Sequence, residues 1–499
     1  MRRSISAQSG RIIVVSLRRI VTGTAFVSSA SVIRILAQFI ALPILSRLLS
    51  STDYGLVAIA SPFIAFAMLI TDAGLGMSLV RSTPLEDDTA WSTSFWVIFS
   101  LGGTLAAILL LLSPLAAYAF GEPRLHLIVF ILSFTIAAQA AAVIPGAALQ
   151  QSRRFSAVAV IEISSTLLGI ATAVTAALLG AGVWSLVAQQ IVFFAVRLVL
   201  TFAWSPFRPR LVFNVAAIRH HLIFGRDILS TNLIAHVSGS IDNLAIGGVL
   251  GPTAVGYYNM AMQFIRLPTT VITGPLQFVL YSHLATIKDN LPAIRRTFLL
   301  ITRILAILVI PSLGMVAAAH YPVFKIVLSE KWSQSGTLFM ILAGAGAVQA
   351  MMALGGDIML VLGRSDLRLR TTIEFSLIWF VALLLSLAIS RDIHWVAVAY
   401  NCAVVLYMPR TLSIVLSLIK CPITQYLEAM AVPALVTPAT IFLYAEIVRL
   451  CAPSLYADVV IAAALTLATM AVCILIQLRP LRDESVGVAL PFRSNPVTQ

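Results

Sequence analysis

The chain is a succession of apolar segments, each long enough to cross a lipid bilayer. A helix that spans a bilayer needs about 20 apolar residues. Hydropathy, with turns and charges as boundaries, predicts fourteen such helices: 20–48, 54–80, 91–118, 123–150, 156–180, 182–204, 222–250, 254–285, 292–320, 335–362, 370–390, 394–418, 428–450 and 455–478. The predicted fold class is an all-α polytopic membrane protein of about 14 transmembrane helices.

The charged residues support this fold class and predict an orientation. Only 11% of the 499 residues are charged and 60% are hydrophobic, whereas about a quarter of a soluble domain is charged, so a water-soluble enzyme is excluded. Of the 33 lysines and arginines, 23 lie on the N-terminus, the C-terminal tail, or at the loops after even-numbered helices, and six lie in the loops after odd-numbered helices. Positive charge marks the cytoplasmic side. We therefore expect a multi-pass membrane protein with both termini in the cytoplasm.

The first helices repeat later in the chain. A gapless shift of 201 residues lays Ser29–Val80 on Ser230–Tyr281 with eleven of 52 positions identical, among them Thr52/Thr253 and Gly55/Gly256. Internal repeats are common in secondary transporters. The repeat predicts two six-helix lobes and an appended helix pair. The expected domains are a basic N-terminus (1–19), an N-lobe (20–204), a linker (205–221), a C-lobe (222–418), helices 13 and 14 (419–478), and a cytoplasmic tail (479–499).

The repeated segments also carry a family pattern. Residues 38–79 read QFIALPILSRLLSSTDYGLVAIASPFIAFAMLITDAGLGMSL, and residues 242–261 read DNLAIGGVLGPTAVGYYNMA. This pattern resembles the polysaccharide-transport branch of the MOP (MATE-like) exporter superfamily, the Wzx-type oligosaccharide-lipid flippases. The resemblance implies a protein of the bacterial inner membrane. It would flip undecaprenyl-diphosphate-linked repeat units from the cytoplasmic to the periplasmic leaflet by alternating access, for exopolysaccharide, capsule or O-antigen synthesis.

Charges inside the predicted spans indicate ion pairs. A charge at the centre of a spanning helix costs about 2.5–3.5 kcal/mol, so it normally faces a partner or a cavity. Counting depth at about 1.5 Å per residue predicts three structural pairs: Glu162 with Arg197, the repeat-related Glu374 with Arg410, and Arg303 with Asp357. For Arg303 and Asp357 a functional role stays equally open. Arg34 and Arg266 lie near mid-membrane, and no acidic residue is predicted at the depth of either arginine.

Arg34 and Arg266 also lie on polar helix faces. Residues three or four apart share a face, which groups Ser31, Arg34 and Gln38 on helix 1, Asn259, Gln263, Arg266 and Thr270 on helix 8, and His236 among the polar residues of helix 7. We interpret these stripes as the lining of a hydrated lumen; hydrogen bonding between packed helices is the alternative. Amides and hydroxyls suit sugar hydroxyls, and arginines suit a diphosphate.

The remaining expectations concern coupling, partners and rival functions. Asp72 and Asp242 are candidates for binding a coupling cation, Na⁺ or H⁺, or else are caps or lobe contacts. No other cofactor and no metal is expected, and no P-loop motif for ATP occurs. The expected partners are the bilayer, the lipid-linked oligosaccharide, and polymerase and export components, with no nucleic acid. The rival functions are a multidrug/cation antiporter, a flippase for the peptidoglycan precursor, and a membrane-embedded glycan polymerase.

Overall fold

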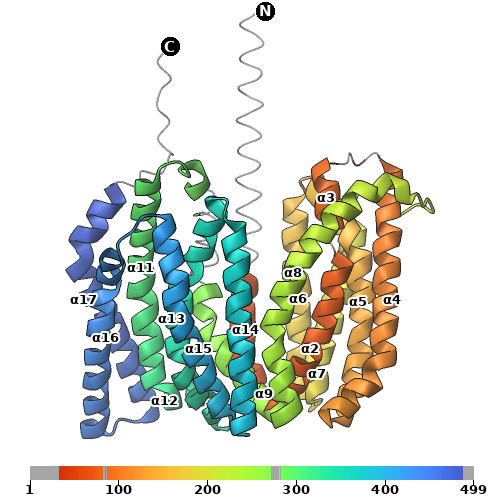
Figure 1. Ribbon diagram of the computed structural model, residues 1–499. Helices are drawn as coiled ribbons and strands as arrows, with labels where there is room; N and C mark the ends of the chain where they lie inside the picture. The colour runs from red at the N-terminus through yellow and green to blue at the C-terminus, as the bar shows by residue number, and fades with distance from the viewer. Residues whose placement is uncertain are drawn as a thin grey trace, which may run out of the picture. The chain divides into compact units, whose positions relative to one another are not determined.

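The computed structural model describes residues 33–72, 74–82, 85, 87–270, 280 and 283–486, and its secondary structure within these ranges is helical (Figure 1). It divides into two compact units, Met1–Gly256 (unit 1) and Tyr257–Gln499 (unit 2). Unit 1 holds a helical segment at 33–48, α2 (Ser51–Asp72), α3 (Leu75–Ser82), α4 (Asp88–Phe120), α5 (Pro123–Gln151), α6 (Phe155–Leu178), α7 (Val183–Trp204), α8 (Val215–Leu250) and the start of α9 (Pro252–Ile265). Unit 2 holds the rest of α9, α11 (Leu291–Ala318), α12 (His320–Val327), η2 (Glu330–Trp332), α13 (Ser333–Val361), α14 (Ser365–Ile389), α15 (Ile393–Leu418), α16 (Ile423–Cys451) and α17 (Leu455–Val486).

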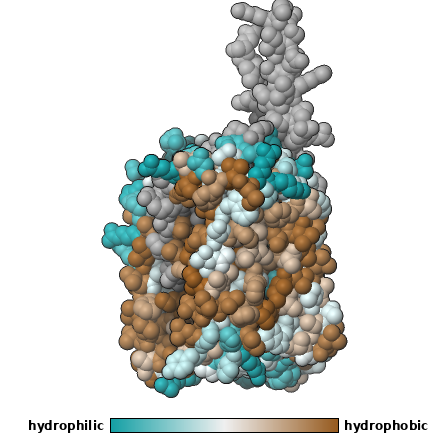
Figure 2. Space-filling view, turned by 90° about the vertical axis from the view of Figure 1, so that its right-hand side faces the viewer, coloured by the Kyte–Doolittle hydropathy of each residue, from teal (hydrophilic) through white to brown (hydrophobic). Residues whose placement is uncertain are grey.

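Eleven helices in the described ranges are long and apolar enough to cross a membrane, and each corresponds to a predicted span. The all-α membrane fold is therefore confirmed, since hydrocarbon forces the backbone to satisfy its own hydrogen bonds. The predicted segments 20–48 and 254–285 run into residues outside the described ranges, and 222–250 forms part of α8. The count of fourteen is not confirmed. On the face shown in Figure 2, apolar residues cover the middle and hydrophilic residues gather at the ends.

The two units divide later in the chain than the linker predicted at 205–221. The segment that precedes α8 is hydrogen-bonded to α4. Trp96 Nε1 donates to the Arg210 carbonyl (2.8 Å), and the Asn214 amide donates to Thr93 Oγ1 (3.0 Å). α8 then packs against α2, α3 and α4. The hydroxyl of Ser78 and Nδ1 of His221, 2.7 Å apart, join α3 to α8. Consequently α8, expected in the second lobe, belongs to unit 1.

One helix lies at the centre of each unit. α5 packs against α2, α3, α4, α6 and α7 in unit 1, and α11 packs against α12, α13, α16 and α17 in unit 2. More than half of the spanning window is buried in α5 (56%) and α11 (61%), whereas only 17% is buried in α4 and in α17. Capping fixes where several helices begin: Asp87 accepts from the Ala90 amide at the start of α4, and Asn290 accepts from the Ala293 amide at the start of α11.

The first turns of α2 and α9 cross in backbone contact within unit 1. A Cβ placed on Gly55 would lie 1.7 Å from the carbonyl oxygen of Pro252, and one on Gly256 would lie 1.9 Å from that of Ser51. The hydroxyls of Thr52 and Thr253 are 2.8 Å apart. These residues occupy equivalent positions under the 201-residue shift, so each turn contacts the equivalent turn of the repeat. A contact between equivalent residues is the local geometry of a two-fold axis.

Candidate functional site

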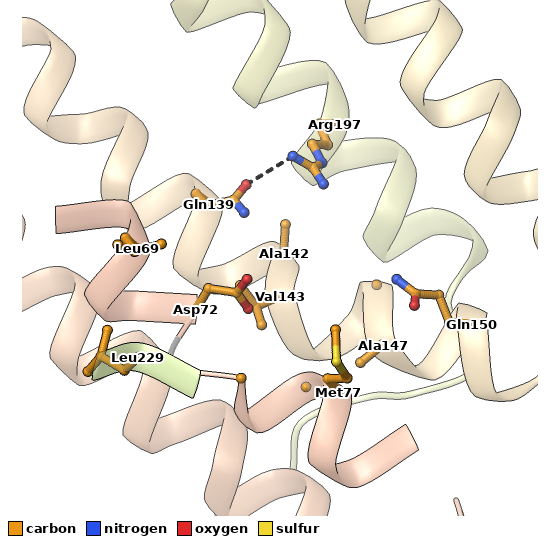
Figure 3. Close-up of a pocket in the computed structure, with 13 residues that line it drawn as sticks. Leu69, Asp72, Met77, Gln139, Ala142, Val143, Ala147, Gln150, Arg197 and Leu229 are labelled. Atoms are coloured by element: carbon orange, nitrogen blue, oxygen red, sulfur yellow. Dashed lines mark hydrogen bonds between the residues drawn. The ribbon is translucent and has the colours of Figure 1, made fainter. Parts of the chain in front are cut away.

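A polar pocket of about 230 Å³ lies in unit 1 where the second span is broken (Figure 3). α2 ends at Asp72 and α3 begins at Leu75, and Gly74 between them adopts a φ of +66°, which favours glycine. Asp72 points into the pocket (Figure 3). Across from it, α5 contributes Gln139 and Gln150, and α7 contributes Arg197. Broken helices at membrane depth are typical of substrate and ion sites in transporters.

A carboxylate between two arginines adjoins this pocket. Oε1 of Glu162 on α6 lies 3.1 Å from Nη2 of Arg197, and Oε2 lies 3.7 Å from Nη1 of Arg34. Nη1 of Arg197 also donates to Oε1 of Gln139 at 3.3 Å. One negative and two positive groups leave a net charge of +1 on this cluster. The side chains stay 24–43% exposed, so their guanidinium groups remain accessible.

The structure thus brings Glu162 and Arg197 together, as the sequence predicted. The expectation that Arg34 lacks an acidic partner is wrong. Depth along each helix put Arg34 near mid-membrane and Glu162 about 10 Å from the cytoplasmic face. The long arginine side chain covers the remaining difference in depth.

Unit 2 repeats the arrangement. Glu374 on α14 lies 3.5 Å from Nε of Arg410 on α15 and 2.8 Å from Nε of Arg370, and it accepts a 2.9 Å hydrogen bond from the hydroxyl of Tyr407. The predicted Glu374–Arg410 pair is present, again with a second arginine. Sequence reasoning missed Arg370, Tyr407 and, in unit 1, Gln139 and Gln150. The glutamines were visible as amides in an otherwise apolar, alanine-rich segment.

The third predicted pair differs. Asp357 on α13 lies 3.8 Å from Arg368 on α14, an arginine that the sequence assigned to a loop. Arg303 is buried within α11, and its pairing with Asp357 stays a prediction.

The polar face of α8 contacts α2. Pro62 has no amide hydrogen, so the carbonyl of Ala58 loses its helical partner. Nδ2 of Asn243 lies 3.5 Å from that oxygen, and Nε2 of His236 lies 3.4 Å from the carbonyl oxygen of Pro62. These contacts fit the packing alternative rather than a lumen role for His236. Asp242, the residue before Asn243, is buried on the same helix.

The other stripe residues are partly described. Gln38 is exposed on the segment 33–48, and Ser31 lies outside the described residues. On unit 2, Gln263, Arg266 and Thr270 are exposed and Asn259 is half-buried. The regular helix ends at Ile265, and Thr270 donates to the Arg266 carbonyl through both its amide and its hydroxyl. Arg266 forms no ion pair with any residue that the structure describes.

This geometry defines a polytopic helical protein with charged clusters held inside its membrane spans, the arrangement of a transporter rather than of an enzyme with a catalytic loop. A family model described as "Polysaccharide biosynthesis protein" matches residues 44–337, more than half of the chain. The chain belongs to this family.

Two curated relatives are transport or biosynthesis proteins of bacterial polysaccharides. The chain is 27% identical over 306 residues to the succinoglycan biosynthesis transport protein ExoT of Rhizobium meliloti (strain 1021), which covers 61% of this chain and 62% of ExoT. It is 23% identical over 382 residues to the lipopolysaccharide biosynthesis protein WzxC of Escherichia coli (strain K12), covering 74% and 76%. The match therefore spans less than two thirds of ExoT.

Two solved structures share the fold. The lipid II flippase MurJ in an inward closed conformation has a TM-score of 0.72 at 13% identity, covering 92% of this chain and all of MurJ. An inward-facing multidrug resistance MATE family transporter of the MOP superfamily has a TM-score of 0.60 at 13% identity, covering 78% and 99%. At this identity the likeness establishes the fold alone, which the chain shares with both structures.

Proposed function

We propose that the protein flips an undecaprenyl-diphosphate-linked oligosaccharide from the cytoplasmic to the periplasmic leaflet by alternating access, for exopolysaccharide, capsule or O-antigen synthesis. Membership of a polysaccharide biosynthesis family supports the substrate class. The observation that carries the proposal is the Arg34–Glu162–Arg197 cluster, which keeps a net positive charge beside neutral amides within membrane spans.

The chemistry of the cluster suits a phosphorylated sugar lipid. A guanidinium binds phosphate oxygens through two parallel hydrogen bonds, and Glu162 holds both guanidinium groups in place without neutralising them. Gln139 and Gln150 supply donors and acceptors for sugar hydroxyls. Arg266 on unit 2 is a further proposed phosphate contact. A surplus positive charge is poorly suited to the organic cations that a multidrug antiporter exports.

The test is transport by reconstituted protein. Proteoliposomes are loaded with a fluorescent lipid-linked oligosaccharide, and transfer between leaflets is followed. We expect Arg34→Glu and Arg266→Glu each to lower the rate at least tenfold. Arg124→Glu, the same change at an exposed position in the first turn of α5, should leave the rate unchanged. Normal transport by both charge-reversed proteins, at wild-type levels of insertion, would refute the role of the arginines.

The cellular phenotype separates the rival functions. Loss of the gene should trap lipid-linked repeat units on the cytoplasmic side. Loss of a polymerase would instead leave single units on the periplasmic side, loss of a drug antiporter would cause drug sensitivity with normal polymer export, and loss of a peptidoglycan-precursor flippase would prevent growth. Polymerase and export components of the same pathway are the proposed partners.

The proposed location is the inner membrane with both termini in the cytoplasm. The distribution of lysine and arginine among the loops supports this orientation. Reporter fusions active only in one compartment, joined before residue 1 and after residue 486, should both give the cytoplasmic signal. A periplasmic signal at either position would contradict the topology.

We further propose that Asp72 couples transport to a proton or sodium gradient. Asp72 ends α2 beside Arg197, which is already paired with Glu162. Gain or loss of a cation at Asp72 therefore changes the charge that Arg197 faces. We expect Asp72→Asn to transport at a rate independent of the imposed gradient, while the wild type accelerates. Equal gradient dependence in both proteins would exclude this role.

A further inference from the structure

A second cavity in unit 1 is apolar. It encloses about 450 Å³ between α2, α4 and α8, which places it within the size range of small-molecule sites. Its walls are formed by Phe63 and Phe66 of α2, Leu105 and Leu109 of α4, and Ile241 and Leu244 of α8. Almost none of the lining surface is polar.

Pro62 lies at the cavity wall and deprives α2 of one backbone hydrogen bond. α8 is held against α2 there through the hydrogen bonds of His236 and Asn243. Those polar contacts fix the distance between α2 and α8. The side chains of α4 do not fill the gap, so the lining atoms lack neighbours on one side. Apolar occupants restore such contacts.

The cavity is continuous with the membrane-facing surface of α4. Leu112 lines the cavity and is 47% exposed, and its neighbours Leu111 and Leu115 are 76% and 58% exposed. These residues lie in a candidate membrane span, where hydrocarbon covers them. A lipid chain can therefore enter from the bilayer without crossing a polar surface.

The opposite wall belongs to α8. Ser240 and His236 line the cavity, but their polar atoms contact each other at 3.4 Å and His236 also contacts the carbonyl oxygen of Pro62, so the cavity surface stays apolar. An apolar cavity open to the bilayer suits the hydrocarbon chain of an amphiphile.

We infer that this cavity holds a segment of the polyprenyl chain of the lipid-linked substrate. The inference rests on the proposed function, because that substrate is the amphiphile whose head must leave the bilayer surface while its chain remains in hydrocarbon. Chain binding here tethers the substrate to unit 1 during flipping.

Photolabelling tests the occupant directly. Proteoliposomes receive either a polyprenyl-diphosphate-linked disaccharide with a diazirine in its chain or phosphatidylglycerol with a diazirine in an acyl chain. We expect the polyprenyl probe to label residues 62–67 and 105–112, and unlabelled polyprenyl phosphate to compete. The phospholipid probe should label the outward face of α4 only. Equal labelling of the cavity by both probes, or no polyprenyl labelling there, overturns the inference.

Filling the cavity tests its contribution to transport. Leu109→Trp projects into the cavity, and Leu111→Trp makes the same change on the exposed face of α4. We expect Leu109→Trp to slow transport of the long-chain substrate at least fivefold, to spare a substrate with one isoprene unit, and Leu111→Trp to affect neither. An equal effect on both chain lengths overturns the inference. If the wild type moves neither substrate, the proposed function fails and the inference with it.

Discussion

Replacing Gly55 by alanine is expected to force α2 and the start of α9 apart. The new Cβ would lie 1.7 Å from the carbonyl oxygen of Pro252 and 2.5 Å from its carbon, whereas ordinary contact begins at 3.4 Å. Both atoms belong to the backbone and cannot rotate away. The two first turns must therefore separate by roughly 1.7 Å, which is overpacking at a helix crossing.

The expected cost follows from two opposing effects. Overpacking typically costs about 1–3 kcal/mol, and alanine recovers up to about 1 kcal/mol over glycine in a helix. The net loss is about 1–2 kcal/mol, which lowers the Tm by roughly 2–8 °C for a unit of this size. Gly103→Ala is the matched control. It lies in α4, and a Cβ added there would meet no atom within 4 Å, so its Tm should stay the same or rise.

Thermal unfolding in detergent, followed by tryptophan fluorescence, measures these shifts. Gly55→Ala combined with Gly256→Ala should cost less than the sum of the two single changes, because the first substitution already separates the turns that the second would push apart. A Gly55→Ala protein as stable as Gly103→Ala, or strictly additive losses in the double variant, would refute the backbone crossing.

Three further predictions concern single contacts. Glu162→Gln removes the carboxylate shared by two arginines and should cost about 1–3 kcal/mol; adding Arg197→Gln should recover part of the lost Tm, and a further loss would contradict the pairing. Asp392→Ala removes the N-cap of α15 and should cost about 1 kcal/mol. The backbone amide and ring of His394 lower the pKa of Asp392 in the folded protein, so this difference should be full at neutral pH and start to fall below the unfolded-chain pKa of about 4. It should vanish only below the lowered pKa of the folded state, where Asp392 is protonated in both states; a difference that persists there would contradict the cap. Asn243→Leu removes the donor to the Ala58 carbonyl of α2 and should speed hydrogen exchange in α2 but not in α5, whereas unchanged exchange would contradict that bond.

The repeated carboxylate clusters show where depth reasoning succeeds. Glu162 pairs with Arg197 and Glu374 pairs with Arg410, and both pairs follow from position along the helices alone. An ionised group inside a span needs a partner at its own depth, and the few charges of this chain leave few choices. The same reasoning missed the second arginine of each cluster. The depth of a residue in the membrane does not determine the direction in which its side chain points around the helix.

The sequence by itself determined that this chain forms membrane-spanning helices, because apolar segments of this length must bury their backbone hydrogen bonds in helices. It also identified the repeat, whose equivalent residues Thr52 and Thr253 are in contact in the structure. Only the tertiary structure decided what the polar faces contact. Asn243 binds the Ala58 carbonyl freed by Pro62, His236 contacts the Pro62 carbonyl, and α8 packs with unit 1. Hydropathy reports the preference of each residue for lipid or water, whereas the partner of a polar group depends on which helices pack side by side.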